Sequence, residues 1–236
     1  MTTIGTRLRL RTWDAADPAA PRGTVAVFPG RGEHTGVYAR LAARLSAEGY
    51  RIQVVEPGSD GHDDEIRDWL SDLRGPLFLL GTDTGALSAA RHAEGAAAVV
   101  LAGVPGEPDW EPPANFGWRD EIALRAADPA RRAALRSDPL MRPGELLHPV
   151  SEPLDPPSWV PTLVLHGEAD LLSPSLPLRQ RVVGRPRLRF VTVAASGHDV
   201  LHDTHERSVA AEILQFLERF RAGGEAVLRP SIRSTL

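Results

Sequence analysis

Short apolar runs alternate with amphipathic stretches over the first hundred residues. Residues 7–13 alternate charged and apolar side chains with period two, which predicts a half-buried edge strand. Further strands are expected where the apolar runs are compact, and helices where apolar positions recur every three or four residues. The predicted strands are 24–29, 51–56, 77–80 and 97–102, and the predicted helices are 37–49, 65–73 and 86–93. This order predicts an α/β protein with a doubly wound, mostly parallel sheet.

The alternation stops at about residue 105 and resumes only after residue 158. This proline-rich stretch has two helical patterns, near 120–127 and 130–136. We expect it to be a small helical lid inserted over the carboxyl edge of the sheet of a single domain, 1–236. After it, strands are expected at 161–166 and 187–193, and helices at 175–182 and 204–221. Residues 222–236 contain turn formers without an apolar period, which predicts a flexible tail.

Composition and charge limit the partners that we expect. The chain is 42% hydrophobic and 25% charged, which is ordinary for a soluble globular protein. A net charge of −4 predicts no nucleic-acid or anionic-membrane partner. No apolar run is long enough to span a bilayer, and the first residues lack the apolar core of a signal peptide. We therefore expect a cytoplasmic protein that acts on a small molecule, whereas its oligomeric state has no signal in the sequence.

Two residue types are missing, and their absence excludes several chemistries. The sequence contains no Cys, which excludes disulfides, a thiol nucleophile and a thiolate metal site. It also contains no Lys, so all 27 basic residues are Arg. A lysine Schiff base and a phosphate-loop lysine are therefore excluded. No cofactor or metal is expected.

The segment Gly81-Thr82-Asp83-Thr84-Gly85 lies between a predicted strand and a predicted helix. Its two glycines are typical of the sharp Gly-x-Ser-x-Gly turn that projects a nucleophile from a sheet edge. Here the central residue is a carboxylate. The alternative for Asp83 is a turn-capping aspartate that binds backbone amides.

Two later loops carry an acid and a histidine. Asp170 follows the strand predicted at 161–166, and His198 follows the strand predicted at 187–193. Groups beyond the carboxyl ends of parallel strands converge in one crevice, so Asp83, Asp170 and His198 are expected to meet. By spacing alone, His198, His202 and His205 with nearby aspartates also fit a metal cluster. We favour capping of the last helix for Asp203 and its neighbours.

With these motifs, the chain resembles the α/β-hydrolase superfamily, and within it the monoacylglycerol lipase and lysophospholipase-like branch, also called serine aminopeptidase-like. The segment from Pro29 to His34 resembles that branch's His-Gly-x-Gly-Glu-His motif, with proline in place of the first histidine. The resemblance implies an oxyanion hole formed by the backbone N–H groups of Arg31 and Thr84. It also implies the order nucleophile, acid, histidine. The departure is Asp83, where that branch carries serine.

An aspartate at this position resembles the nucleophile of epoxide hydrolases and haloalkane dehalogenases. The resemblance implies that Asp83 attacks a small or medium apolar substrate and forms an ester, which water activated by His198 and oriented by Asp170 then hydrolyses. The marks of these subtypes are missing: both tyrosines, Tyr38 and Tyr50, lie outside the lid, and Thr84 stands where dehalogenases usually carry Trp.

Other functions remain open at this stage. Asp83 and His198 could serve as acid and base in a lyase or cyclase of secondary metabolism, or the protein could bind a ligand without turnover. An engineered replacement of serine would leave the same sequence. Three residues are predicted substrate contacts, although lid packing or a surface role is the simpler interpretation of each: Trp110, Trp118 and His34.

Overall fold

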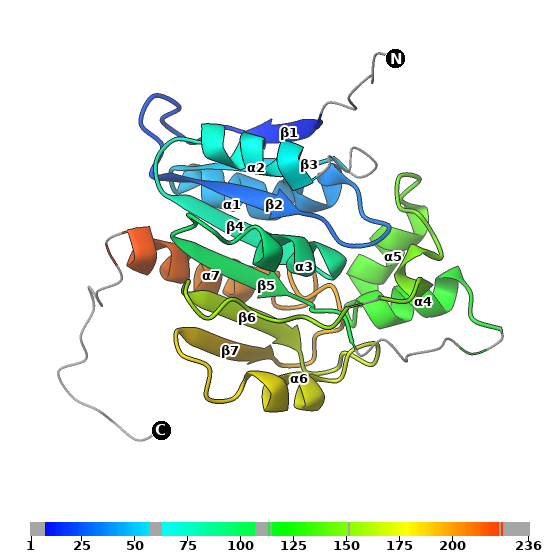
Figure 1. Ribbon diagram of the computed structural model, residues 1–236. Helices are drawn as coiled ribbons and strands as arrows, with labels where there is room; N and C mark the ends of the chain where they lie inside the picture. The colour runs from blue at the N-terminus through cyan, green and yellow to red at the C-terminus, as the bar shows by residue number, and fades with distance from the viewer. Residues whose placement is uncertain are drawn as a thin grey trace, which may run out of the picture.

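The computed structural model describes residues 8–56, 63–106, 113, 115–150, 152–221 and 223. These residues form one seven-stranded sheet with the order β1-β3-β2-β4-β5-β6-β7 (Figure 1). The strands are β1 (Leu10–Trp13), β2 (Gly23–Phe28), β3 (Tyr50–Val55), β4 (Leu77–Thr82), β5 (Ala98–Ala102), β6 (Thr162–Gly167) and β7 (Leu188–Val193). The predicted α/β class and mostly parallel sheet are therefore confirmed.

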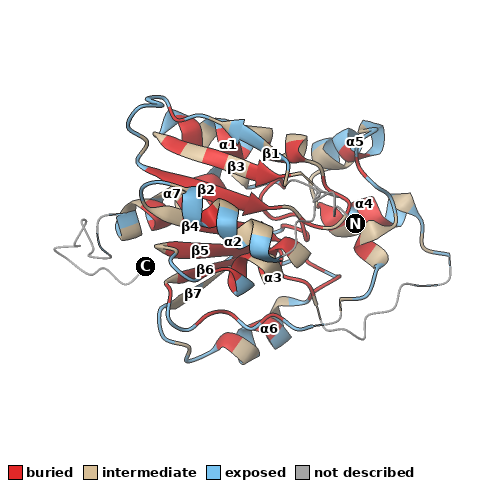
Figure 2. Ribbon diagram, turned by 45° about the horizontal axis from the view of Figure 1, so that its top comes forward, coloured by how far each residue is buried: buried red, intermediate tan, exposed pale blue. Residues whose placement is uncertain are grey.

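The strand pairing follows from the hydrophobic pattern. β1 lies at the edge of the sheet, as its period-two pattern predicts, and it pairs antiparallel with β3, whereas all other neighbouring strands are parallel. Every residue of β2, β5 and β6 is buried. Such strands are apolar on both faces because helices cover both sides of the sheet (Figure 2).

The helices form a layer on each face. α1 (Ala39–Ala47), which follows the short helix η1 (Thr35–Tyr38), and α7 (Glu206–Arg221) pack their apolar residues into one core cluster. The other face is covered by α2 (Asp63–Asp72), α3 (Thr84–Arg91) and α6 (Ser175–Val182), which contribute to a second cluster. The core is thus split by the sheet, as in a doubly wound fold.

The segment between β5 and β6 holds both helices that the sequence predicts there. They are α4 (Trp118–Arg125) and α5 (Pro129–Ser137), followed by the short helix η2 (Glu145–Leu147). α4 and α5 share a small apolar cluster of their own and lie beyond the carboxyl ends of the strands (Figure 1). That this segment acts as a lid stays a prediction, and the name lid segment (residues 105–158) refers only to its position in the chain. The predicted tail lies outside the described residues except for Gly223.

Within the described part of the chain, no helix is both long and apolar enough to cross a membrane.

Candidate active site

Asp83 lies in a sharp turn between β4 and α3. Its backbone has φ 48° and ψ −124°, a conformation that residues other than glycine rarely adopt. Both flanking glycines are required by close packing: a Cβ on Gly81 would lie 2.1 Å from the Gly85 carbonyl oxygen, and one on Gly85 would lie 2.1 Å from the Phe28 carbonyl oxygen. The Asp83 side chain makes no capping hydrogen bond to α3. The turn therefore presents the carboxylate and does not use it as a helix cap.

The structure brings Asp83, His198 and Asp170 together. The distance from His198 Nε2 to Asp83 Oδ1 is 3.3 Å, and His198 Nδ1 donates to Asp170 Oδ2 at 2.8 Å. Asp170 is itself fixed, because its Oδ1 accepts the backbone N–H groups of Leu172 (3.0 Å) and Ser173 (2.9 Å). All three members of this group are buried. This is the arrangement that the predicted nucleophile, base and orienting acid require, and the roles themselves stay predictions.

The side chain of Arg31 also enters this site, which the sequence analysis did not foresee. Its Nε donates to Asp83 Oδ2 and its Nη2 to Asp83 Oδ1, both at 2.7 Å. The backbone N–H of Arg31 donates to Asp83 Oδ2 at 2.9 Å, so this predicted oxyanion donor binds the aspartate itself. Arg31 Nη1 reaches the carbonyl oxygen of His148 in the lid segment. The guanidinium thus covers the carboxylate.

These contacts set the charges of the site. Burial alone would raise the pKa of Asp83, but hydrogen bonds and charge from Arg31 and His198 outweigh it and hold that pKa well below its usual range. Burial would lower the pKa of His198, whereas Asp170 and Asp83 raise it to about 10. At neutral pH the site therefore holds an ionised Asp83 beside a protonated His198.

A buried carboxylate supports the loop that carries Arg31. Glu33 accepts the backbone N–H of Gly30 at 2.8 Å and the Thr82 hydroxyl at 3.0 Å, and it also accepts the Tyr38 hydroxyl. Because Tyr38 is buried in this contact, it is not placed to donate a proton to a substrate. Glu33 instead connects the loop after β2 to the end of β4.

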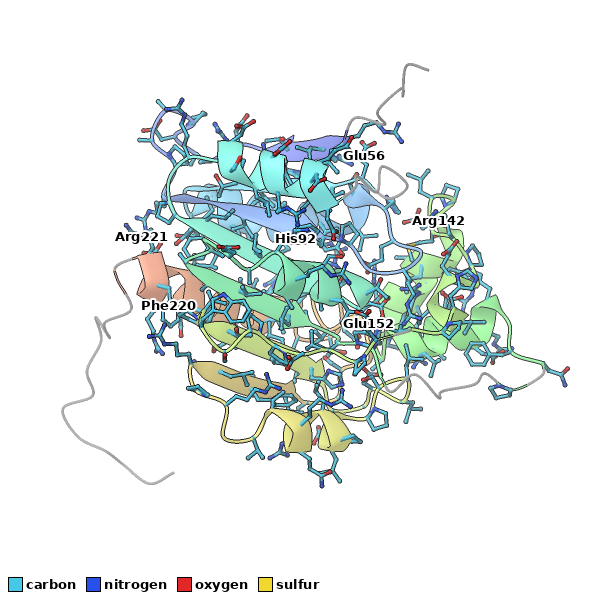
Figure 3. The ribbon with its side chains drawn as sticks, in the orientation of Figure 1. Glu56, His92, Arg142, Glu152, Phe220 and Arg221 are labelled. Carbon is cyan, nitrogen blue, oxygen red and sulfur yellow. The ribbon has the colours of Figure 1, made fainter. Side chains whose placement is uncertain are left out.

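A cavity of about 420 Å³ adjoins the site, within the size range of small-molecule pockets. Arg31, Thr84 and Gly85 form its inner wall. The remaining lining residues are partly apolar and partly charged: Phe28, Pro29, Gly30, Val55, Asp63, Ile66, Ser88, Arg91, Arg142 and Glu145. Figure 3 shows Arg142 beside the lid helices. A second hollow, of about 10 Å³, lies against Thr82, Asp83 and His198 and has room for about one water molecule.

The three predicted substrate contacts are placed differently. His34 does not line the cavity: its Nδ1 accepts the N–H of Gly36 (3.2 Å) and its Nε2 donates to Asp138 (2.9 Å). Trp118 packs against the apolar cluster of α4 and α5. Trp110 lies outside the described residues. Of the predicted site residues, Arg31 and Thr84 line the cavity. Asp83, His198 and Asp170 are not among its lining residues.

Asp203 has a different role from the helix cap that we expected. Its carboxylate accepts the backbone N–H groups of Gly197 (2.6 Å), Ala127 (2.9 Å) and Asp128 (2.7 Å). It therefore joins the histidine loop to the lid segment, and none of these three amides belongs to α7, the helix that the carboxylate was expected to cap. Among the residues that the structure describes, no three His, Asp or Glu side chains are grouped to hold a metal ion.

Buried charges under the site were also missed by the sequence analysis. Arg125 and Glu121 on α4 form an ion pair at 2.9 Å, with both side chains 1% exposed. Arg125 Nη1 also lies 3.5 Å from Asp199, the residue after His198. The spacing of four residues between Glu121 and Arg125 is the sequence signal for an ion pair on one face of a helix. That spacing does not indicate burial, because such pairs are usually exposed on a surface helix.

No family model matches this sequence, and no curated protein matches it. Solved structures do resemble it. The monoacylglycerol lipase of Paleococcus ferrophilus has a TM-score of 0.69 at 18% identity, covering 90% of this chain and 99% of that chain. A soluble variant of monoglyceride lipase from Saccharomyces cerevisiae has a TM-score of 0.70 at 15% identity, covering 93% and 96%. A thermostable carboxyl esterase from Bacillus coagulans has a TM-score of 0.66 at 14% identity, covering 91% and 94%. The protein thus has the α/β-hydrolase fold.

Proposed function

We propose that this protein is a cofactor-independent hydrolase in which Asp83 forms an ester with a small or medium-sized substrate. The observation that carries the proposal is the placement of the two Asp83 oxygens. Oδ2 accepts the backbone N–H of Arg31, where an oxyanion would be stabilised, and Oδ1 faces His198 Nε2 at 3.3 Å. Lipase and esterase neighbours of the same fold are consistent with a hydrolase.

The first step needs no base, because Asp83 is already ionised. Asp83 Oδ1 forms a bond to an sp³ carbon of the substrate, and the bond from that carbon to its leaving group breaks. The electron pair departs with the leaving group. The product of this step is an alkyl ester of Asp83, which is uncharged.

Loss of that charge prepares the second step. The pKa of His198 is held at about 10 by Asp170 and Asp83 together, so esterification removes one of the two carboxylates that keep it protonated. His198 then releases a proton, which balances the charge of the leaving group, and becomes a base still oriented by Asp170. The hollow against Thr82, Asp83 and His198 has room for the water that it would activate.

Hydrolysis then restores the resting enzyme. Water gives one proton to His198 and adds to the Asp83 carbonyl carbon, and charge develops on Oδ2, beside the Arg31 N–H at 2.9 Å. The other proton of the water goes to the oxygen of the departing alcohol. The bond between this carbon and the alkylated Oδ1 breaks. The product alcohol leaves with the oxygen that Asp83 supplied, and the water oxygen remains in Asp83.

The test is to trap the ester. His198→Gln removes the base but keeps the nucleophile, so incubation with epoxides, haloalkanes and halogenated acids should add the substrate mass to Asp83, measured by intact-protein and peptide mass spectrometry. Asp83→Asn in the same background is the matched control and should carry no adduct. Full turnover by His198→Gln would contradict the mechanism.

One observation favours a second candidate. Because the pKa of His198 is about 10, its imidazolium is protonated at neutral pH and lies 3.3 Å from a carboxylate, and a lyase or cyclase of this kind uses such an acid beside a base. Such an enzyme would turn over without an ester. It would therefore leave Asp83 unmodified in the trapping experiment while His198→Gln loses activity.

A further inference from the structure

The pairing of Arg31 with Asp83 conflicts with direct access to the nucleophile. Arg31 Nη2 lies 2.7 Å from Oδ1, the same oxygen that faces His198. Asp83 is only 4% exposed, and the residue that lines the cavity at this point is Arg31, which is bound to the Asp83 carboxylate. A substrate in the cavity therefore reaches Oδ1 only after the guanidinium has moved.

Moving Arg31 leaves its charge without a partner. Its side chain is 12% exposed, and among the described residues its other hydrogen bond goes to the carbonyl oxygen of His148. Breaking an ion pair in such surroundings is strongly unfavourable unless another anion replaces the lost one. The guanidinium holds Asp83 through Nε and Nη2 at once, a two-point geometry that a second carboxylate can reproduce.

We infer that the substrate is itself a carboxylate, which takes the place of Asp83 on Arg31 and so releases the nucleophile. The inference rests on the proposed function and names the substrate class of that site. Binding of the substrate anion and exposure of Asp83 Oδ1 become one event, since the guanidinium exchanges one carboxylate for another. A neutral substrate of the same size offers no such exchange.

The distances also place the reacting carbon. The guanidinium and Oδ1 are in contact at 2.7 Å before the exchange. A guanidinium that moves only as far as the exchange of carboxylates needs stays beside Oδ1, so it brings only the near carbons of the substrate within reach, the one or two that follow the carboxylate. Asp83 Oδ1 would displace a leaving group there, and hydrolysis of the ester would yield a hydroxy acid.

The cavity suits such an amphiphilic anion. Phe28, Val55 and Ile66 offer an apolar wall for its body. The charged lining of the cavity holds three arginines, Arg31, Arg91 and Arg142, against two carboxylates, Asp63 and Glu145. Arg91 lies near Asp63 (3.9 Å) and Glu152 (3.7 Å), whereas in the described part of the chain no carboxylate pairs with Arg142. Arg142 is thus a second cation available to the ligand.

Binding of an unreactive carboxylate tests the inference without turnover. Hexanoate is titrated by calorimetry into the wild-type protein, Asp83→Asn and Arg31→Gln, with circular dichroism to show that each is folded. Asp83→Asn removes the internal competitor, so hexanoate should bind about tenfold more tightly than to the wild type. Arg31→Gln should abolish binding. Arg207 is exposed, so Arg207→Gln serves as the matched control and should bind hexanoate like the wild type. Hexanol is the neutral control ligand and should bind to no variant more tightly than to the wild type.

The results separate this inference from the proposed function. Unchanged hexanoate affinity in Asp83→Asn, or wild-type affinity in Arg31→Gln, overturns the carboxylate site. If His198→Gln is esterified by 1-bromohexane as readily as by 2-bromohexanoate, the covalent mechanism holds and the inference fails. If Arg31-dependent hexanoate binding is found but 2-bromohexanoate never esterifies Asp83, the anion site holds and the proposed function fails.

Discussion

Arg125 on the lid helix α4 donates from Nη2 to the backbone carbonyl oxygen of Arg31 at 2.7 Å. The same guanidinium is paired with Glu121, whose other oxygen accepts the backbone N–H of Gly144 at 2.6 Å. One buried ion pair therefore fixes both the loop that carries Arg31 and the loop before η2. The position of the predicted oxyanion donor depends on a residue of the lid segment.

Arg125→Gln should be strongly destabilising, because it leaves Glu121 buried without its cation. Breaking a buried pair costs about 3–5 kcal/mol of unfolding free energy, and urea denaturation measures it. Glu121→Gln combined with Arg125→Gln should cost less than Arg125→Gln alone. Arg67→Gln is the control: its side chain is 61% exposed in its pair with Asp64, so the loss should stay below about 1 kcal/mol. Equal losses for Arg67→Gln and Arg125→Gln would contradict the role of burial.

The sheet and its order of elements could be predicted because the pattern is strong there. β4 and β5 are buried on both faces and are plain apolar runs in the sequence. β1 is only half-buried: Leu10 and Trp13 are partly covered, whereas Arg11 and Thr12 are exposed. Residues 175–182 form α6 with the predicted bounds. The last helix begins at Glu206 rather than at 204, since the Asp203 carboxylate binds amides of other segments instead of capping it.

The site could be predicted only as far as chain order fixes it. Asp83, Asp170 and His198 each follow a strand, so parallel topology alone brings them together. The direction of the Arg31 side chain could not be predicted in this way, because a long side chain in a loop can turn toward solvent or toward the sheet. The burial of Arg125 depends on packing between α4 and the loop after β2, which no local pattern encodes.

Stability should depend on pH through His198. Its pKa is raised from an ordinary 6.5 to about 10, so its pairing stabilises the folded protein fully below about pH 6.5 and is lost as the pH rises through about 10. The difference in unfolding free energy between the wild type and His198→Gln should therefore shrink over this range. Urea denaturation across the range measures it. Parallel curves for the two proteins would show that His198 is not held protonated.

Asp83→Ser should gain esterase activity if the rest of the site supports an acyl-enzyme. Removing the Asp83 carboxylate lowers the pKa of His198 from about 10, which makes it available as the base for serine. Hydrolysis of p-nitrophenyl butyrate by Asp83→Ser should exceed that by Asp83→Ser/His198→Gln by about a hundredfold, the contribution typical of a general base. The wild type should be as slow as the double variant. If Asp83→Ser hydrolyses the ester no faster than the wild type, the hypothesis that the rest of the site supports an acyl-enzyme is wrong.

Gly85→Ala should destabilise the protein strongly, because its Cβ would lie 2.1 Å from the Phe28 carbonyl oxygen and 2.5 Å from that of Pro29. Backbone atoms cannot yield as a side chain does, so the loss of unfolding free energy should reach about 3 kcal/mol or more. Gly117→Ala is the control, since its Cβ would meet only the Asp120 carboxylate, at 4.0 Å. Thermal denaturation should show a clear shift for Gly85→Ala alone. Similar melting temperatures for both variants would mean that the turn can relax.

The central claim is that Asp83 becomes covalently attached to the substrate, and oxygen exchange tests it most directly. Wild-type protein is allowed to turn over 2-bromohexanoate in H₂¹⁸O, and the peptide that contains Asp83 is then analysed by mass spectrometry. We predict that ¹⁸O appears in Asp83 and that the product of a single turnover contains unlabelled oxygen. If Asp83 stays unlabelled while the product of the first turnover carries ¹⁸O, water attacks the substrate directly and the covalent mechanism is wrong.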